Sequence, residues 1–356
     1  MSRQSDLAFA HQSDRINLGH ALAARTAELW RRMDLHNLDA TWDLVAPVMV
    51  RQVAAAQLVA ATQATTYVSA LDRSYPGFTP QQAAIVPQAF TNVMGDGREI
   101  APALFGAVTG TKTLIGQGVA PVTAFESGAR FIAMIAASAL NDMGRSADRT
   151  LAAGKGYTSY IRVVGGSACS RCAILAGIYS GETAFERHVH CQCTTCPIPH
   201  EGKAAPKGFH DSPQSFFDSL SKKDQDRVFT NAGAEAIRNG ASPVSVVNAR
   251  RGAYGIGYSG QKQSALEVIP KGRRLQPVTI GVRADGTPLQ VFATTEGTTA
   301  RGAFGRGELR ATDAAMKDGR YRRTTTLRVM PEQILKMAGN NPARWRELLA
   351  KYGYLN

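Results

Sequence analysis

The sequence is short of several things, and each shortage excludes a class of protein. Aromatic residues make up 7% of the 356 positions, so much of the 44% hydrophobic content is alanine and valine. The longest apolar run, 131–140, is about half the roughly 20 residues that a membrane-spanning helix needs, and it predicts a buried helix instead. The first residues show no apolar segment behind a basic head, as a secretory signal would. We therefore expect a soluble protein with no membrane partner, made in a reducing compartment.

Acidic residues are also scarce, and their shortage is concentrated in one region. The chain carries 41 Lys and Arg against 28 Asp and Glu, a net charge of +13. Residues 241–356 alone hold 19 basic against 8 acidic residues, which gives +11 of that excess. A segment this basic favours a polyanionic neighbour, most simply DNA, contacted through its phosphates without reading sequence. A solvated basic surface that only keeps the protein soluble is the alternative interpretation.

Cysteine is absent from most of the chain, yet all five cysteines lie within 28 positions. Two histidines accompany them, and the segment contains, in order, Cys169, Cys172, His188, His190, Cys191, Cys193 and Cys196. A Cys-x2-Cys turn places two thiolates at about the separation that a tetrahedral zinc requires. An odd number of cysteines without a secretory signal argues against a disulfide framework. The spacing therefore predicts a metal site, with free thiols or disulfides as the alternative.

The segment offers more donors than a four-coordinate ion can use. The first ligand set that we predict is Cys169, Cys172, His188 and Cys191. Cys193 competes with Cys191 for the fourth position, and His190 is a substitute for His188. Such a set leaves no open coordination position, so it predicts a structural zinc rather than a catalytic one.

The hydrophobic pattern predicts an α+β fold in three parts. Residues 1–155 form an α-helical domain, residues 156–210 a strand plus a Cys/His metal-binding lobe, and residues 211–356 a basic α+β region. In the first part, helices are expected over 11–33, 37–71, 80–94, 98–117 and 121–152.

The remaining elements follow from shorter signals. Strands are expected at 160–164 and near Ile178, and Pro197 to Gly208 is expected to be a loop. Capped helices are expected over 212–220 and 221–238, followed by a short helix or turn over 242–252. A hairpin is expected to turn at Asp285-Gly286, and the last two helices to begin at the prolines 331 and 342.

No catalytic constellation is legible in the sequence. Gly-x-Ser-x-Gly does not occur, and His11, His20 and His36 are isolated in the helical part, where each is expected to be a surface or packed side chain. Cysteines committed to a metal do not serve as nucleophiles. The sequence therefore favours a non-enzymatic protein over an enzyme. Glu182 and Glu186 lie inside the Cys/His loop, so a carboxylate near the metal keeps an enzymatic alternative open.

Several stretches resemble the MuF-like minor head proteins of tailed phages. Cys172-x-x-Leu-x-Gly177 followed by His188-x-x-Cys-x-Cys193 carries the core of that resemblance. The blocks that resemble members from actinobacteriophages in particular are 225–252, 294–302, 330–334 and the end of the chain, Leu-Leu-x-Lys-Tyr-Gly-Tyr. Together they cover roughly residues 155–356. The family often has proline after the first histidine, where this chain has Val189.

The resemblance implies a minor capsid protein that acts in head morphogenesis. Such proteins are encoded beside the portal, enter the procapsid in few copies and lie near the portal vertex and the packaged DNA. The implied partners are the portal protein and the scaffold or major capsid protein, and the implied location is the virion, after synthesis in the host cytoplasm. Some relatives are labelled capsid maturation proteases. A maturation protease or a zinc-dependent nuclease is therefore the alternative function.

Overall fold

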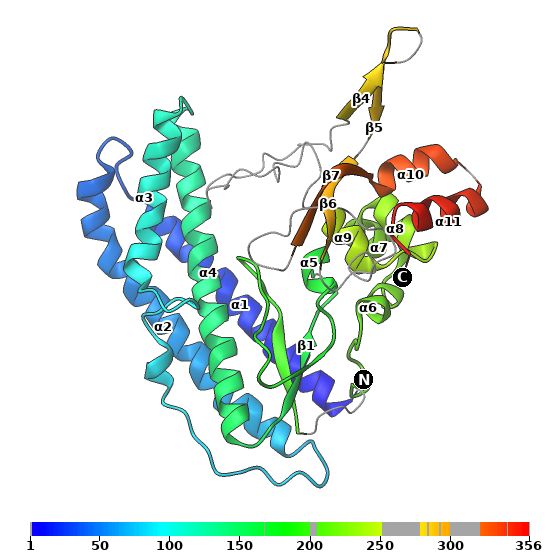
Figure 1. The fold of residues 1–356 in the computed structure, drawn as a ribbon. Helices are drawn as coiled ribbons and strands as arrows, with labels where there is room; N and C mark the ends of the chain where they lie inside the picture. The colour runs from blue at the N-terminus through cyan, green and yellow to red at the C-terminus, as the bar shows by residue number, and fades with distance from the viewer. Residues whose placement is uncertain are drawn as a thin grey trace. The chain divides into compact units, whose positions relative to one another are not determined.

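The computed structural model describes residues 2–166, 168–199, 205–250, 278–282, 285–291, 293–299, 321–339 and 341–355. The chain folds into two compact units. Unit 1 consists of Met1–Ala168 and Leu175–Asp211, and unit 2 of Cys169–Ile174 and Ser212–Asn356. The described elements form a helix-rich chain with small antiparallel sheets, which confirms the α+β class (Figure 1).

Unit 1 is built on four long helices. They are α1 (Arg3–Arg31), α2 (Leu38–Asp72), α3 (Ile100–Gly116) and α4 (Pro121–Gly154). Helix α4 packs against each of the other three, and α1 also packs against α2. Small residues let α4 approach its neighbours closely. At Gly128, for example, an added Cβ would lie 2.3 Å from the Trp30 ring. The helical character predicted for this part of the chain is confirmed.

Some helices of unit 1 begin or end at other residues than the apolar periodicity predicts, because capping side chains and prolines determine the helix ends. Helix α1 begins at Arg3, eight residues before the predicted start, because Ser2 and Ser5 form a capping box. Helix α2 runs from Leu38 to Asp72 and includes Pro47. The helix predicted over 80–94 is wrong, since only a short 3-10 turn, η1 (Pro87–Phe90), forms there. Pro87 explains this result, because its ring excludes the preceding turn and forces Val86 into an extended conformation.

A three-stranded antiparallel sheet packs on these helices. Its order is β2-β1-β3, with β1 at Ser159–Val163, β2 at Ile178–Ser180 and β3 at Thr194–Ile198. The predicted first strand is confirmed, whereas β3 occupies the end of the Cys/His segment and the start of a predicted loop. Ile161 of β1 lies opposite Cys196 of β3. Both side chains are buried in a core that also contains Tyr67 and Leu71 of α2.

Among the described helices, α2 is long and apolar enough to cross a bilayer by length and composition. The core helix of a protein in water passes the same test, and α2 packs against α1, α3 and α4 within unit 1. The finding is therefore weak evidence for a membrane. The expectation of no membrane partner stays a prediction.

Unit 2 contains short helices and two hairpins. The helices are α5 (Ser170–Ala173), α6 (Pro213–Ser219), α7 (Lys222–Phe229), α8 (Asn231–Arg238), α9 (Pro243–Ala249), α10 (Pro331–Ala338) and α11 (Pro342–Lys351). The strands pair as β4 (Val278–Val282) with β5 (Pro288–Val291), and β6 (Ala293–Thr299) with β7 (Tyr321–Val329). The predicted hairpin and terminal helices are confirmed, and β6–β7 is a second hairpin that the sequence pattern did not reveal.

The backbone conformation and hydrogen bonds of single residues determine how the helices of unit 2 are divided and connected. The helix predicted over 221–238 is two helices, because Thr230 has a left-handed backbone (φ 66°) and caps α8 through its side chain. The end of the chain is fixed to the start of α9, since Ser242 N–H donates to the Tyr354 carbonyl at 2.7 Å. Residues 300–320, which connect β6 to β7 and form part of the basic segment 241–356, lie outside the described residues.

Candidate metal centre

The predicted metal ligands lie at the ends of short elements. Cys169 is the N-cap residue of α5, and Cys172 is buried one turn later in the same helix. His188 and Cys191 belong to one turn, in which Cys191 N–H donates to the His188 carbonyl at 3.2 Å. Cys193 immediately precedes β3 and is buried. Each donor is therefore held by a local turn or by the start of a strand.

The structure brings all five predicted donors into two groups that could hold a metal ion. One group is Cys169, Cys172 and His188, and the other is Cys172, Cys191 and Cys193. Within each group the ligand atoms all lie within 4.8 Å of one another. Cys172 belongs to both groups, so it is the donor on which the arrangement depends most.

The donors fit a small, soft divalent cation. Sulfurs around a tetrahedral zinc lie roughly 3.8 Å apart, because each Zn–S bond is about 2.3 Å long. The ligand atoms of each group, which lie within 4.8 Å of one another, are therefore close to the spacing that a bound zinc ion requires. The chemistry also fits, since thiolate and imidazole donors select zinc over hard cations such as magnesium or calcium. Neither group, among the described residues, includes a carboxylate.

Two further side chains of the segment lie in neither group. His190 takes a left-handed backbone (φ 64°), and its N–H donates to Ser138 Oγ at 2.8 Å, so this residue turns the chain. Cys196 belongs to the core, where its thiol lies 3.8 Å from the Tyr75 hydroxyl. Burial raises the pKa of the Cys196 thiol to about 12, which keeps it protonated and disfavours metal ligation.

Two buried arginines hold the loop that carries Cys191 and Cys193. Arg145 of α4 donates to the Cys191 carbonyl at 3.1 Å and to the Cys193 carbonyl at 2.9 Å, and it is also paired with Asp142. Arg162 of β1 donates to the Cys191 sulfur at 3.4 Å. The loop is therefore attached both to a helix and to the sheet.

A buried ionic cluster lies on the same helix, α4. Asp148 is fully buried, and His11 Nε2–H donates to its carboxylate at 3.0 Å. Arg15 pairs with the other carboxylate oxygen at 3.5 Å. Burial alone would raise the pKa of Asp148, but His11, Arg15 and Arg145 lower it below its usual value. The carboxylate is therefore ionised at neutral pH.

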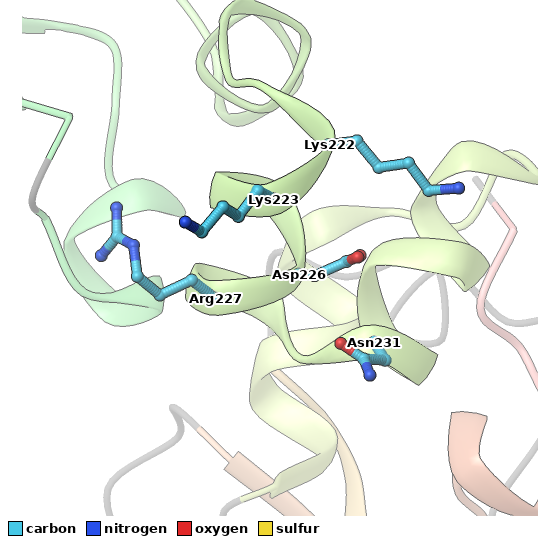
Figure 2. Close-up of a pocket in the computed structure, with 5 residues that line it drawn as sticks. All are labelled: Lys222, Lys223, Asp226, Arg227 and Asn231. Atoms are coloured by element: carbon cyan, nitrogen blue, oxygen red, sulfur yellow. The ribbon is translucent and has the colours of Figure 1, made fainter.

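A basic hollow lies on α7 and α8 of unit 2. It has a volume of about 530 Å³ and is lined by Lys222, Lys223, Asp226, Arg227 and Asn231. Figure 2 shows Lys223 and Arg227 extending to one side of α7, and Lys222 and Asp226 to the other. The carboxylate in this lining is paired with Arg238 at 2.9 Å. Cations outnumber anions in the lining, which suits a phosphate-bearing partner.

The sequence pattern did not reveal the buried ionic cluster that Asp148 forms with His11 and Arg15. His11 was expected to be a surface or packed side chain and is packed, but its pairing with Asp148 was not expected. A signal existed in the predicted helix 121–152, where Asp142, Arg145 and Asp148 recur every three residues among small apolar ones. Charges at that spacing share one helix face, and a charged stripe on a packed face predicts buried ion pairs.

Comparisons with known proteins give no relative for this chain. No family model matches it, and neither the curated proteins nor the solved structures contain a match.

Proposed function

We propose that this chain is a minor capsid protein of a tailed phage that acts in head morphogenesis and contains a structural zinc. The observation that carries the proposal is the grouping of Cys169, Cys172, His188, Cys191 and Cys193. These donors come from the segment whose sequence resembles the MuF-like minor head proteins. The downstream blocks of that resemblance extend it through most of unit 2.

The zinc would be held by Cys172 and three of the four other donors. A zinc ion in such a Cys/His set crosslinks the chain and stabilises its fold. Among the described residues, neither group includes a carboxylate, and this favours a structural role over a catalytic one. Arg145 fixes the backbone on the ligand side by donating to the carbonyls of Cys191 and Cys193.

Contact with protein partners in the head would use the helical unit. Leu44 of α2 is 77% exposed and Val122 of α4 is 68% exposed. We assign this role to a portal, scaffold or major capsid partner.

The proposal predicts that this chain is incorporated into phage heads only when the portal protein is present. The chain is to be expressed with the portal and major capsid proteins encoded beside its gene, and the assembled particles purified by sedimentation. Quantitative mass spectrometry should find the chain in particles, in far fewer copies than the capsid protein. Omission of the portal should abolish incorporation. A chain that stays in the soluble fraction in both preparations would contradict the proposal.

The same particles test the alternative function. A maturation protease would cleave the major capsid protein or the scaffold at defined sites, and a zinc-dependent nuclease would cut added duplex DNA. Glu182 and Glu186 are the carboxylates that the Cys/His loop offers for such chemistry. Cleavage by the wild-type chain that is lost on chelation would replace the structural assignment with the enzymatic one.

Contact with packaged DNA, which we predict for the basic residues 241–356, is part of the proposal, and the basic hollow on α7 and α8 would extend this contact to cationic side chains that precede that segment. Replacement of Lys222 and Lys223 by Gln should reduce the slope of log K against log salt by about 2, since each neutralised phosphate contributes about 0.9. The measurement is fluorescence anisotropy with a labelled duplex between about 50 and 200 mM salt. Lys112→Gln combined with Arg51→Gln, at exposed positions of α3 and α2, removes the same number of charges as the control and should leave the slope unchanged. Equal effects of the two variants would show that overall charge alone drives binding.

A further inference from the structure

The buried arginine of β1 contacts the Cys/His loop at several points. Arg162 is 2% exposed and lies in the central strand of the sheet. Its Nη1 donates to the Glu186 carbonyl at 2.7 Å, and its Nη2 donates to the Cys191 sulfur at 3.4 Å. The guanidinium also lies over the Phe185 ring, 4.1 Å from its centroid. One side chain therefore holds both the backbone and a sulfur of the Cys/His loop.

The charge of Arg162 matches the chemistry of a ligating thiolate. A guanidinium keeps its proton even when buried, so the sheet carries a fixed positive charge at this point. An N–H that donates to a neutral thiol forms a weak bond, whereas the same donor forms a charge-assisted bond with a thiolate. Zinc with three thiolates and one imidazole has a net charge of −1, which must be balanced where the ligand sulfurs are buried, as those of Cys172 and Cys191 are.

The second arginine near the loop plays a different part. Arg145 donates to carbonyls and is paired with Asp142, so its charge already has a carboxylate partner. Arg162, by contrast, donates to the Cys191 sulfur itself. Phe185 contacts both guanidinium groups, since its ring centroid lies 5.0 Å from Arg145 Cζ and 4.1 Å from Arg162 Cζ.

We propose that Arg162 is a positioning residue of the metal centre, which orients the Cys191 thiolate toward the ion and balances its charge. This inference rests on the proposed zinc site. It assigns Cys191, rather than Cys193 alone, to the ligand set. Residues that orient a ligand from outside the coordination sphere are typically worth 10- to 100-fold in metal affinity.

The test compares Arg162→Met and Arg162→Lys with the wild-type full chain and with Arg149→Met. Arg149 is a matched control, because it also donates to backbone carbonyls, those of Gly181 and Thr183, and lies over an aromatic ring, Tyr160. Zinc affinity is measured by competition with a chromophoric chelator, and the sulfur environment by the charge-transfer band of the cobalt-substituted protein. Circular dichroism in excess zinc verifies that each variant is folded.

Arg162→Met should bind zinc about 10- to 100-fold more weakly than wild type. Its cobalt band should move to lower energy, because a thiolate without the N–H donor holds its electrons less tightly. Arg162→Lys keeps the charge but cannot make both bonds, so its loss should be smaller, and it serves as the folded variant if Met disrupts the sheet. Arg149→Met should change neither quantity. An unshifted band with wild-type affinity in both Arg162 variants overturns the inference and leaves the zinc site intact, whereas a wild-type chain that binds no zinc overturns both.

Discussion

Replacement of Cys172 by alanine is expected to abolish stable metal binding. Cys172 is the donor shared by the two groups, so its loss leaves Cys169 with His188, and Cys191 with Cys193. Structural zinc sites are worth about 10–16 kcal/mol, or roughly 3 kcal/mol for each of four ligands. The loss of one ligand should therefore weaken zinc binding by about 100-fold or more.

The measurement is the metal content of purified protein after dialysis against a weak chelator. The wild-type chain should retain about one zinc, by the four-ligand rule, and Cys172→Ala close to none. Cys196→Ala is the matched control, because this cysteine lies in the core beside Tyr75 and belongs to neither group. It should retain the full zinc content. If the Cys172→Ala protein keeps its zinc, neither of the two groups is the metal site.

Proteolysis should show where the structure is lost. Arg171 and Arg187 lie in the Cys/His segment and offer trypsin two cleavage sites. In the variant, or in wild type treated with EDTA, these sites should be cut much faster than in the zinc-loaded protein. Strands β1 and β3 should persist, because they pack in the core of unit 1 with α2 and α4. Cleavage at equal rates with and without zinc would contradict a stabilising role for the metal.

Replacement of Asp148 by alanine is expected to destabilise unit 1 by about 3–5 kcal/mol. The change leaves the buried Arg15 guanidinium without its carboxylate and removes the acceptor of the His11 hydrogen bond. An uncompensated buried charge costs far more than the ion pair itself contributes. For the same reason, Arg15→Met combined with Asp148→Leu should recover part of the loss, because both charges are then absent.

Urea unfolding of the full chain measures this effect. The chain has three tryptophans, and Trp30 and Trp42 are buried in unit 1, so fluorescence in a Trp345→Phe background reports on that unit. Asp43→Ala, at an exposed position of α2, is the control and should leave the transition almost unchanged. An Asp148→Ala transition as late as that of the control would contradict a stabilising role for the cluster.

The same carboxylate predicts a pH dependence. The pKa of Asp148 is lower in the folded protein than its usual value near 3.9, so the unfolded chain takes up the proton first. The stability contributed by the ionised group is therefore complete above about pH 5 and decreases as the pH falls through 3.9 toward the folded pKa. Asp148→Ala should lack this component of acid destabilisation. A parallel loss of stability in both proteins below pH 5 would assign the effect to other groups.

The elements that the sequence predicted are those that local chemistry determines. The helices of unit 1 follow from apolar periodicity, and the terminal helices from Pro331 and Pro342 in their first turns. The pairing of neighbouring donors was equally local, since Cys169 and Cys172 share one turn and Cys191 and Cys193 are separated by one residue. The failed helix over 80–94 had a local cause as well, and the position of Pro87 was sufficient to exclude it.

The tertiary structure decided which side chains these local elements bring together. His11 and Asp148 are 137 residues apart, and Arg162 meets Cys191 across 29 residues. Hydrogen-bonded turns and caps depend on neighbours three or four residues away, so a sequence displays them directly. Contacts between distant residues depend on how the helices and the sheet pack, which hydrophobic burial sets through the whole of unit 1. The sequence alone therefore determined the donor types and their spacing, whereas packing brought Cys172 to Cys191 and Cys193, assigned Cys196 to the core and placed Arg162 against the Cys191 sulfur.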